Sequence, residues 1–178
     1  IIALFVSIGE TSAQEVRSGW EVVDSGTESD LLTAEFHEGE FWAFGTGGIM
    51  ISSIDGGGTW SESGISVSQD LTSSDSNFGS MAVAGNGGTV LLMKDGMWTD
   101  VSTSLLGDIT DIALTGNSSF VVIQQDEVWT CEILEDGSAE WSPASGHGEI
   151  DHFSISFLDS ENGLISGENG VIMASTDG

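Results

Sequence analysis

Short stretches in which apolar and polar side chains alternate run along the chain and predict β-strands. Residues 32–36 and 153–157 show this period of two, which is typical of a half-buried strand. Residues 90–93 and 171–174 are continuous apolar runs, which we expect to form middle strands buried on both faces. Residues 72–77 are polar, so we expect a poorly formed strand there. No segment shows the period of an amphipathic helix, and the pattern therefore predicts an all-β domain.

One tight turn between two of these strands has a complete sequence signature. Residues 53–60 read Ser-Ile-Asp-Gly-Gly-Gly-Thr-Trp, and the defining positions are Ser53, Asp55, Gly57, Thr59 and Trp60. An aspartate in such a turn accepts hydrogen bonds from nearby backbone N–H groups, and glycines supply backbone conformations with positive φ. We therefore expect Asp55 to fix its own hairpin and Trp60 to begin the next strand.

Weaker copies of this turn recur with a period of about 40 residues. They are centred on Asp95, on Asp136 and on the pair Ser175 and Asp177, so that successive turn aspartates lie 40, 41 and 41 residues apart. Tryptophans follow a similar period, at Trp20, Trp60, Trp98 and Trp141, and pairs of glycines precede three of the turns, at Gly45/Gly48, Gly85/Gly88 and Gly167/Gly170. Such a period fits a repeat of four short antiparallel strands, which is the blade of a β-propeller.

Two stretches of the chain carry a resemblance to a known family. Residues 41–60 begin Phe-Trp-Ala-Phe-Gly-Thr-Gly-Gly and end in the complete turn, and residues 162–178 begin Asn-Gly-Leu-Ile-Ser-Gly. In these features the chain resembles the BNR/Asp-box propellers, in particular the photosystem II stability/assembly-factor-like group. The resemblance covers residues 20–178 and implies a β-propeller of four-stranded antiparallel blades. The count of repeats predicts about four blades here, and we expect them to belong to a larger ring of roughly six to eight. For the 178 residues alone, an open arc and a strained four-blade closure are the alternatives.

The repeat also defines the expected domain boundaries. Residues 1–13 are an apolar run followed by Thr-Ser-Ala, and we interpret them as the remnant of a secretory signal peptide, with a buried first strand as the alternative. Residues 14–19 would be a linker and residues 20–178 one propeller domain. We expect an outer strand at 20–26, which could close a ring by pairing with C-terminal strands. The expected blades are 29–64, 69–104, 108–145 and an incomplete one at 149–178.

The charge of the chain changes the expected environment and partners. The sequence has 29 acidic residues against two basic ones, a formal net charge of −27. Such self-repulsion destabilises a fold at low salt and is screened at molar salt, so we interpret the chain as adapted to a saline medium. A surface for a cationic partner is the alternative. Nucleic-acid binding is disfavoured because two cations cannot supply a basic face. The single Cys131 is expected in the core, and Asn117 begins a glycosylation sequon.

Four further aspartates form a candidate cation site. Each lies ten residues after a marker tryptophan and just before the inner strand of its blade: Asp30, Asp70, Asp108 and Asp151. Inner strands line the axis of a propeller, so we expect these carboxylates near one mouth of the channel, together with the glycine-pair turns. Clustered carboxylates favour a hard ion such as Ca²⁺. The alternative is structural, because aspartate is a common turn former.

No catalytic constellation accompanies this architecture. The histidines show no metal-ligand spacing, and no nucleophile turn is present. Sialidases share the Asp-box but bind their substrate with three arginines, whereas Arg17 is the only arginine here. We therefore expect a secreted or cell-surface, monomeric, non-catalytic module that binds a protein, glycan or cation, with no cofactor except Ca²⁺ and no membrane span. The alternative is part of a carbohydrate-active enzyme whose acid and base lie partly in other blades.

Overall fold

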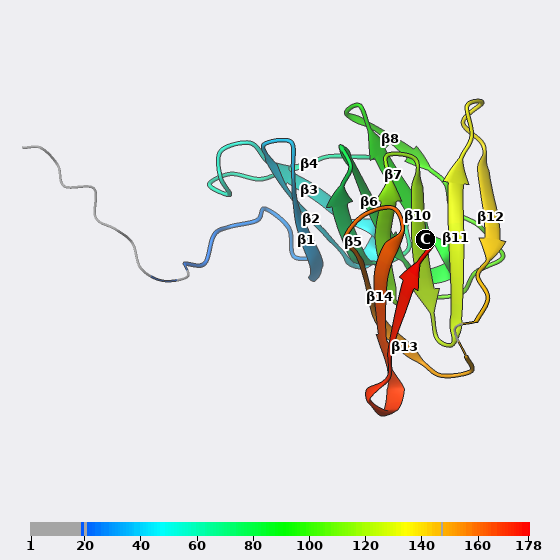
Figure 1. Ribbon diagram of the computed structural model, residues 1–178. Coiled ribbons are helices and arrows are strands. Elements are labelled where there is room, and N and C mark those ends of the chain that lie inside the picture. Colours follow the sequence, from blue (N-terminus) through cyan, green and yellow to red (C-terminus); the bar gives the residue numbers. More distant parts are fainter. Residues whose placement is uncertain (1–18, 20, 147) are drawn as a thin grey trace, which may run out of the picture.

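The computed structural model describes residues 19, 21–146 and 148–178, and this part of the chain is built from β-strands (Figure 1). Its fifteen strands form four antiparallel sheets, and three short 3₁₀ turns are the only helical segments among the described residues. No helix in this part is long and apolar enough to cross a membrane. The expected all-β class is therefore confirmed.

Each sheet is one blade, made from strands that are consecutive in the sequence and paired with their neighbours. The first three blades have four strands and the last has three. Blade 1 comprises β1 (Leu31–His37), β2 (Glu40–Gly45), β3 (Met50–Ser53) and β4 (Ser61–Glu62); blade 2 comprises β5 (Leu71–Asn77), β6 (Ser80–Gly85), β7 (Val90–Lys94) and β8 (Met97–Asp100). Blade 3 comprises β9 (Asp111–Gly116), β10 (Ser119–Gln124), β11 (Glu127–Ile133) and β12 (Ala139–Pro143); blade 4 comprises β13 (His152–Phe157), β14 (Asn162–Gly167) and β15 (Ile172–Thr176).

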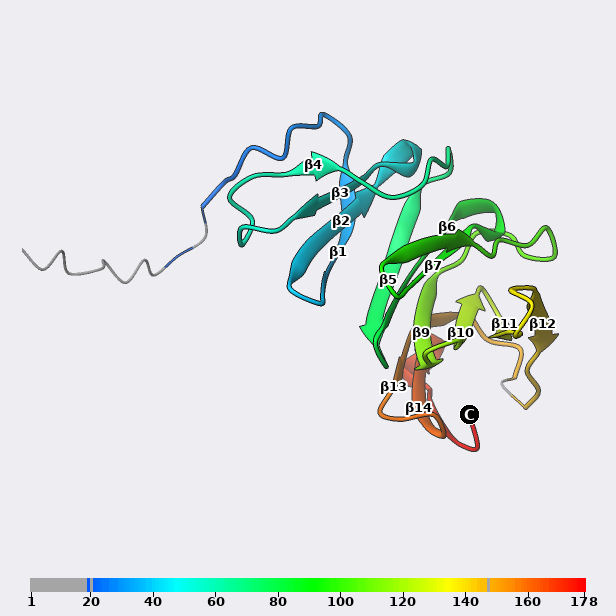
Figure 2. The ribbon, with the colours of Figure 1, turned by 90° about the horizontal axis from the view of Figure 1, so that it is seen from above.

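The blades lie side by side along an open arc (Figure 2). The first strand of each blade packs against the first strand of the next, in the order β1, β5, β9 and β13. No comparable packing joins β13 back to β1 within the described part of the chain. Consequently the first and last blades each keep one sheet face without a neighbouring blade.

The outer strand expected at residues 20–26 is not formed. Residues 21–26 have no strand structure, and Trp20 lies outside the described residues. A strand needs a partner edge, and the edge available to this one is β15, at the opposite end of the open arc (Figure 2). The expected signal-peptide remnant at 1–13 and nearly all of the expected linker at 14–19 also lie outside the described residues.

Apolar clusters between neighbouring blades form the core. One lies between blades 1 and 2, one between blades 2 and 3, and a smaller one between blades 3 and 4. The prediction that residues 90–93 are buried on both faces is confirmed, because β7 lies between two neighbouring blades. The same prediction for residues 171–174 is wrong. Ile172 and Ala174 are exposed because no further blade covers their face of blade 4.

The polar segment 72–77 forms a strand paired with its neighbour, contrary to the sequence-based expectation. It is β5, and its hydroxyl groups hydrogen-bond to the strands on either side. Ser74 Oγ lies 2.7 Å from Thr33 Oγ1 of blade 1, whereas Ser73 donates to the Asp111 carboxylate of blade 3. The side chains of Ser73 and Ser74 thus contact other inner strands rather than an apolar core, so polarity does not prevent strand formation here.

The glycine pairs are explained by close backbone approaches at the end of each second strand. A Cβ atom on Gly45 would lie 1.8 Å from the carbonyl oxygen of Asp30, and one on Gly85 would lie 1.9 Å from that of Asp70. The second glycine of each pair has positive φ; in Gly88, for example, φ is 70°. Only glycine fits both positions, which places these turns beside the aspartates that precede the inner strands.

Candidate functional site

The complete Asp-box at residues 53–60 is a closed network of hydrogen bonds within its own turn. Asp55 accepts hydrogen bonds from the backbone N–H of Thr59 at 2.9 Å, the hydroxyl of Thr59 at 2.7 Å and the hydroxyl of Ser53 at 2.9 Å. The backbone N–H of Gly57 donates to Ser53, and the Trp60 indole donates to the Gly57 carbonyl. The hydrogen bonds from Thr59, followed by that from Ser53, lower the pKa of Asp55 to about 2. The Asp55 carboxylate therefore serves to hold its own turn together.

Two of the three degenerate boxes keep parts of that network. Asp136 accepts hydrogen bonds from the hydroxyl and backbone N–H of Ser138, and these lower its pKa. Ser175 donates to Asp177 at 3.2 Å. Asp95 contributes to its turn through its backbone conformation: Asp95 and the following glycine both adopt positive φ in the β7–β8 turn. All four predicted boxes thus lie in turns that follow the third strand of a blade.

The four aspartates predicted to bind a cation lie next to the glycine-pair turns where these are present, and two of them join neighbouring blades. The Asp70 carboxylate accepts the backbone N–H of Gly47 from blade 1 at 2.8 Å, and the Asp108 carboxylate accepts that of Gly87 from blade 2 at 3.0 Å. We call each such pair an inter-blade clamp. Blade 3 has no glycine pair, and there the backbone N–H of His152, next to Asp151, donates to the Gln125 carbonyl instead. Within the described part of the chain, no blade lies before blade 1 to donate to Asp30.

The clamps occupy carboxylate oxygens that the predicted Ca²⁺ site would use. Among the described residues, no group of three or more histidine, cysteine or acidic side chains is placed to hold a metal ion. Cation binding by Asp30, Asp70, Asp108 and Asp151 stays a prediction, while the hydrogen bonds of Asp70 and Asp108 give both residues a structural role.

Sequence reasoning missed the acidic residues inside the inner strands, of which Asp111 has the most partners. Its carboxylate accepts the hydroxyl of Ser73 in blade 2 and, from blade 4, the hydroxyl of Ser154 and the backbone N–H of Ile155, both at 2.9 Å. It therefore links three blades. The sequence contains only a weak signal for this role, namely a carboxylate at the first position of an otherwise apolar strand.

Glu35 and Asp75 are acidic residues of the inner strands of blades 1 and 2, and they are equivalent to each other and to Ala113 of blade 3 rather than to Asp111. Burial, and secondarily the nearby Asp75 carboxylate, raises the pKa of Glu35. Burial also raises the pKa of Asp75, although its hydrogen bond from the Leu114 backbone N–H, at 2.7 Å, opposes this effect. Both carboxyls thus lie at the inner-strand contacts between blades rather than in an open pocket.

A groove lies between blades 1 and 2. Its volume is about 630 Å³, and we call it the blade 1–2 groove. Its walls come from the β1–β2 hairpin, the segment that follows the two-residue strand β4, and the β7–β8 hairpin. The residues that line it are His37, Glu38, Glu40, Trp42, Ser63, Gly64, Ile65, Met93, Gly96, Met97 and Trp98.

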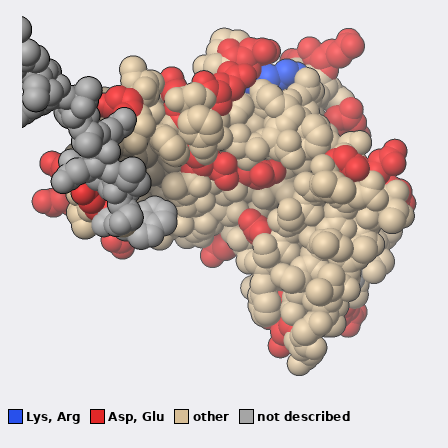
Figure 3. All heavy atoms as spheres, turned by 60° about the vertical axis from the view of Figure 1, so that its left-hand side comes forward, with Lys and Arg blue, Asp and Glu red and all other residues tan. Residues whose placement is uncertain are grey.

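The lining of the blade 1–2 groove combines carboxylates with tryptophan and methionine side chains. Glu38 and Glu40 supply negative charge from the β1–β2 hairpin, and no lysine or arginine is among the lining residues described. The indole N–H groups of Trp42 and Trp98 are buried and have no acceptor within the described part of the chain. Acidic side chains are also scattered over the wider surface (Figure 3). Such a groove suits a ligand that brings positive charge.

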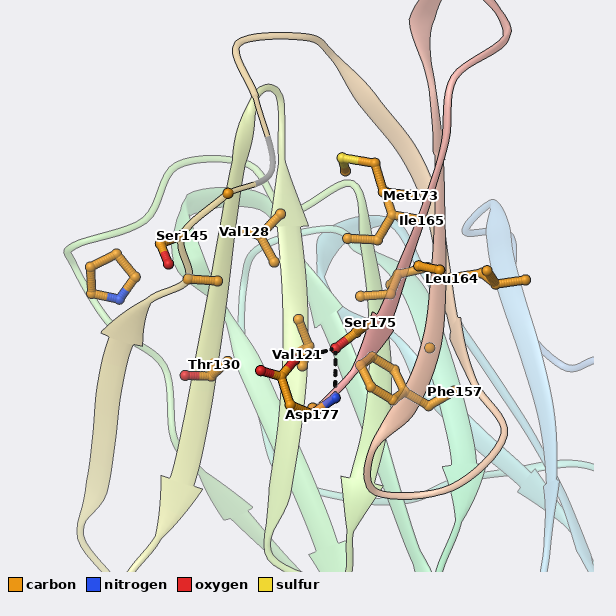
Figure 4. Close-up of a pocket in the computed structure, with 17 residues that line it drawn as sticks. Val121, Val128, Thr130, Ser145, Phe157, Leu164, Ile165, Met173, Ser175 and Asp177 are labelled. Atoms are coloured by element: carbon orange, nitrogen blue, oxygen red, sulfur yellow. Dashed lines mark hydrogen bonds between the residues drawn. The ribbon is translucent and has the colours of Figure 1, made fainter.

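A second cavity lies between blades 3 and 4 and has a volume of about 400 Å³ (Figure 4). Val121, Val128 and Thr130 line it from blade 3, and Phe157, Ile165 and Met173 from blade 4. It also reaches the degenerate Asp-box formed by Ser175 and Asp177. The cavity is thus a part of the blade 3–4 interface that no described side chain fills.

The remaining predicted residues have simple environments. Cys131 is a buried free cysteine in β11, as expected, and burial raises its thiol pKa to about 12. Asn117 is exposed in the β9–β10 hairpin, a position open to glycosylation, which stays a prediction. His37 Nδ1 lies 2.9 Å from Ser76 Oγ, and His152 is buried in β13.

Antiparallel four-stranded sheets packed side by side around their first strands define the chain as a β-propeller. Three solved structures share the fold. The computationally designed Ika4 protein is 15% identical, with a TM-score of 0.70 over 90% of this chain and 100% of that chain. YCF48 from Cyanidioschyzon merolae is 15% identical, with a TM-score of 0.62 over 83% of this chain and 50% of that chain. YCF48 bound to D1 peptide is 12% identical, with a TM-score of 0.58 over 81% of this chain and 48% of that chain.

These comparisons establish the fold and no more. The chain spans about half the length of both YCF48 chains. No known family model matches the sequence, and no curated protein matches it. At identities this low, structural likeness does not transfer a ligand or an activity.

Proposed function

We propose that the chain is a non-catalytic propeller module that binds an extended, basic segment of a protein partner in the blade 1–2 groove. We further propose that it is a BNR/Asp-box propeller, because the hydrogen bonds of residues 53–60 satisfy every defining position of that turn. The photosystem II assembly-factor-like group supplies the nearest description of its repeats.

The single observation that carries the binding role is the composition of the blade 1–2 groove. Glu38 and Glu40 would pair with lysine or arginine side chains of the partner. Another propeller of this fold, YCF48, is described as bound to D1 peptide, which supports a protein partner.

The carbohydrate-active alternative has less support. It would need a carboxylic acid with raised pKa near a second carboxylate, and Glu35 with Asp75 is the pair that comes nearest to this. Asp75, however, already accepts the backbone N–H of Leu114 across the blade 2–3 boundary, and neither residue lines the blade 1–2 groove. Their environment is that of a packing contact.

Selection from a displayed library of random peptides tests the proposal. We expect enriched peptides to combine lysine or arginine with apolar residues. The double variant Glu38→Gln/Glu40→Gln should weaken their binding about tenfold or more, a loss of about 1.4 kcal/mol. The double variant Glu132→Gln/Glu140→Gln makes the same change of charge on blade 3 and should bind like the unmodified chain. Absence of enriched peptides, or equal losses in both variants, would exclude the groove as the binding site.

The acidic surface supports a second part of the proposal, which is function outside the cytoplasm in a saline medium. With 29 acidic and two basic residues, repulsion within the fold is strong unless salt screens it. We expect the urea midpoint of unfolding to rise steeply with NaCl up to about 1 M, where the screening length is about 3 Å. An equally stable protein in dilute buffer would contradict salt adaptation.

A further inference from the structure

Each of the four Asp-boxes contains an aspartate that glycine follows directly. The four pairs are Asp55–Gly56, Asp95–Gly96, Asp136–Gly137 and Asp177–Gly178. An Asp–Gly pair is chemically labile, because glycine has no Cβ to shield its backbone nitrogen, and this nitrogen can attack the aspartate carboxyl carbon to close a five-membered ring. The hydrogen bonds of each turn determine whether the nitrogen and the carboxyl group are available for this reaction.

The complete box restrains its carboxylate. Asp55 accepts hydrogen bonds from the Thr59 N–H at 2.9 Å, the Thr59 hydroxyl at 2.7 Å and the Ser53 hydroxyl at 2.9 Å. Ring closure would pull the carboxyl carbon onto the Gly56 nitrogen and break these hydrogen bonds. The hydrogen bonds from Thr59, and then that from Ser53, also lower the pKa of Asp55 to about 2. The carboxyl group therefore stays ionised, and an ionised carboxyl group cannot lose its oxygen as water.

The turn at Asp136 is protected in a different way. Its carboxylate accepts the Ser138 hydroxyl at 2.6 Å and the Ser138 N–H at 3.0 Å. The attacking nitrogen is engaged as well, because the Gly137 N–H donates to the Leu134 carbonyl at 2.9 Å. Both reacting groups of this pair therefore have hydrogen-bond partners within the turn.

The turn at Asp95 has neither kind of protection. Asp95 and Gly96 are both exposed at the tip of the β7–β8 hairpin, and both have positive φ. Among the described residues, none donates a hydrogen bond to the Asp95 carboxylate, and none accepts one from the Gly96 N–H. The carboxyl group and the attacking nitrogen are thus both available.

We propose that Asp95 is a site of spontaneous isoaspartate formation, and that the hydrogen bonds of a complete Asp-box protect its Asp–Gly pair from the same reaction. The Gly96 nitrogen bonds to the Asp95 carboxyl carbon, and a carboxyl oxygen leaves as water with the proton of the nitrogen. A second water molecule then opens the succinimide ring. Attack at the former backbone carbonyl carries the main chain through the side chain and gives isoaspartate, whereas attack at the former side-chain carbonyl restores aspartate.

Isoaspartate at this position alters one wall of the blade 1–2 groove. The main chain gains one methylene group in the short turn that brings Met93 opposite Trp98. Trp98 lines the groove and packs edge-on against Trp42, with ring centroids 5.4 Å apart. The longer turn disturbs this pairing, so isoaspartate at Asp95 weakens ligand binding in the groove. This consequence rests on the proposed function, whereas the reaction itself does not.

Incubation of the full chain for several weeks in water enriched in heavy oxygen measures the reaction at each turn. Opening of a succinimide inserts one solvent oxygen, so a peptide that contains a reacting pair gains mass after acidic digestion with pepsin. In about 1 M NaCl, which screens the repulsion within the fold, the chain stays folded during the incubation. We expect labelling of Asp95 to be about tenfold or more faster than that of Asp55, since three hydrogen bonds oppose the reaction there. Equal rates in the folded chain would overturn the proposal.

The chain unfolded in urea shows whether the fold causes this difference. Without the hydrogen bonds of the turns, the rates at Asp55 and Asp95 should become similar. A difference that persists in urea would assign it to the neighbouring residues and overturn the protective role. The variant Asp95→Glu is the control for the site, because glutamate would have to close a larger ring, and its peptide should stay unlabelled.

The double variant Ser53→Ala/Thr59→Val tests the protection directly. It removes both hydroxyl donors to Asp55 and keeps the Asp–Gly pair, so labelling of Asp55 should rise toward that of Asp95. The double variant Ser104→Ala/Thr110→Val makes the same chemical changes at exposed positions outside the boxes and should leave Asp55 slow. If Asp55 stays equally slow in both double variants, the protective role is wrong.

Binding of the library-selected peptides before and after incubation tests the effect on the groove. The incubated chain should lose binding in proportion to its isoaspartate content at Asp95, whereas incubated Asp95→Glu should bind like fresh Asp95→Glu. Unchanged binding by a chain rich in isoaspartate would refute the effect on the groove. If no peptides are selected at all, the proposed function fails, and the labelling rates still decide whether Asp95 is the reactive site.

Discussion

The carboxylate of Asp70 accepts the backbone N–H of Gly47 across the boundary between blades 1 and 2, at 2.8 Å. Asp108 and Gly87 repeat the contact one blade further along, at 3.0 Å. Because the donor belongs to a turn that only glycine fits and the acceptor precedes the next inner strand, the clamp fixes each blade against its neighbour. This contact gives the aspartates a structural reason for their period.

Replacing Asp70 with alanine should therefore destabilise the fold. We expect the free energy of unfolding to fall by about 1–3 kcal/mol, because the Gly47 N–H loses a charged acceptor. Urea unfolding at high salt measures the effect. Asp126→Ala removes the same charge from the exposed β10–β11 hairpin and should not destabilise the chain; equal behaviour of the two variants would contradict the clamp.

Asp111 should be more sensitive than Asp70, because its carboxylate joins three blades. An Asp111→Asn variant keeps the size of the side chain, but its amide nitrogen cannot accept the hydrogen bonds from Ser154 and Ile155. We expect a loss of about 2–4 kcal/mol, since buried polar networks fail together. Hydrogen exchange should show blade 4 opening first. Asp126→Asn is the matched control, and a variant as stable as that control would refute the role of Asp111.

The glycine at the end of β6 is expected to tolerate no side chain. In Gly85→Ala, the new Cβ would lie 1.9 Å from the Asp70 carbonyl oxygen, so the backbone must move and the Asn86–Asp70 hydrogen bond must lengthen. We expect destabilisation of at least about 1–3 kcal/mol, measured as a lower urea midpoint. Gly107→Ala has ordinary space around its new Cβ and should be tolerated. Similar midpoints for both would show that the turn is more adaptable than its geometry indicates.

The repeat could be predicted from sequence because local interactions determine its turns and strands. Glycine turns, Asp-boxes and alternating strands depend on residues a few positions apart, and the four blades lie where that spacing places them. The formation of the polar strand β5 and the role of Asp111 in linking three blades could not be predicted in this way. The hydrogen-bond partners of both belong to other blades. Whether the arc closes was equally inaccessible, since closure depends on contacts between its two ends rather than on any single repeat.

Glu35 and Asp75 predict an unusual dependence of stability on pH. A carboxyl whose pKa is raised in the folded state favours folding when protonated. Its contribution is complete below the unfolded value of about 4 and is lost as pH rises through the folded pKa. Asp55 has the opposite sign, because its lowered pKa gives stability that is lost only as pH falls toward about 2. Stability should therefore be greatest on the mildly acidic side of neutrality.

The variant Glu35→Gln separates the effect of the raised carboxyl pKa values from the effect of the lowered pKa of Asp55. It removes the carboxylate that burial and Asp75 disfavour, so the fall in stability between mildly acidic and neutral pH should become shallower, while the loss under strongly acidic conditions should remain. Urea midpoints measured across this range at constant salt provide the test. Glu132→Gln, an exposed replacement of equal charge in blade 3, should keep the slope of the unmodified chain. If both variants flatten the profile equally, general charge repulsion rather than the half-buried pair Glu35 and Asp75 sets the dependence on pH.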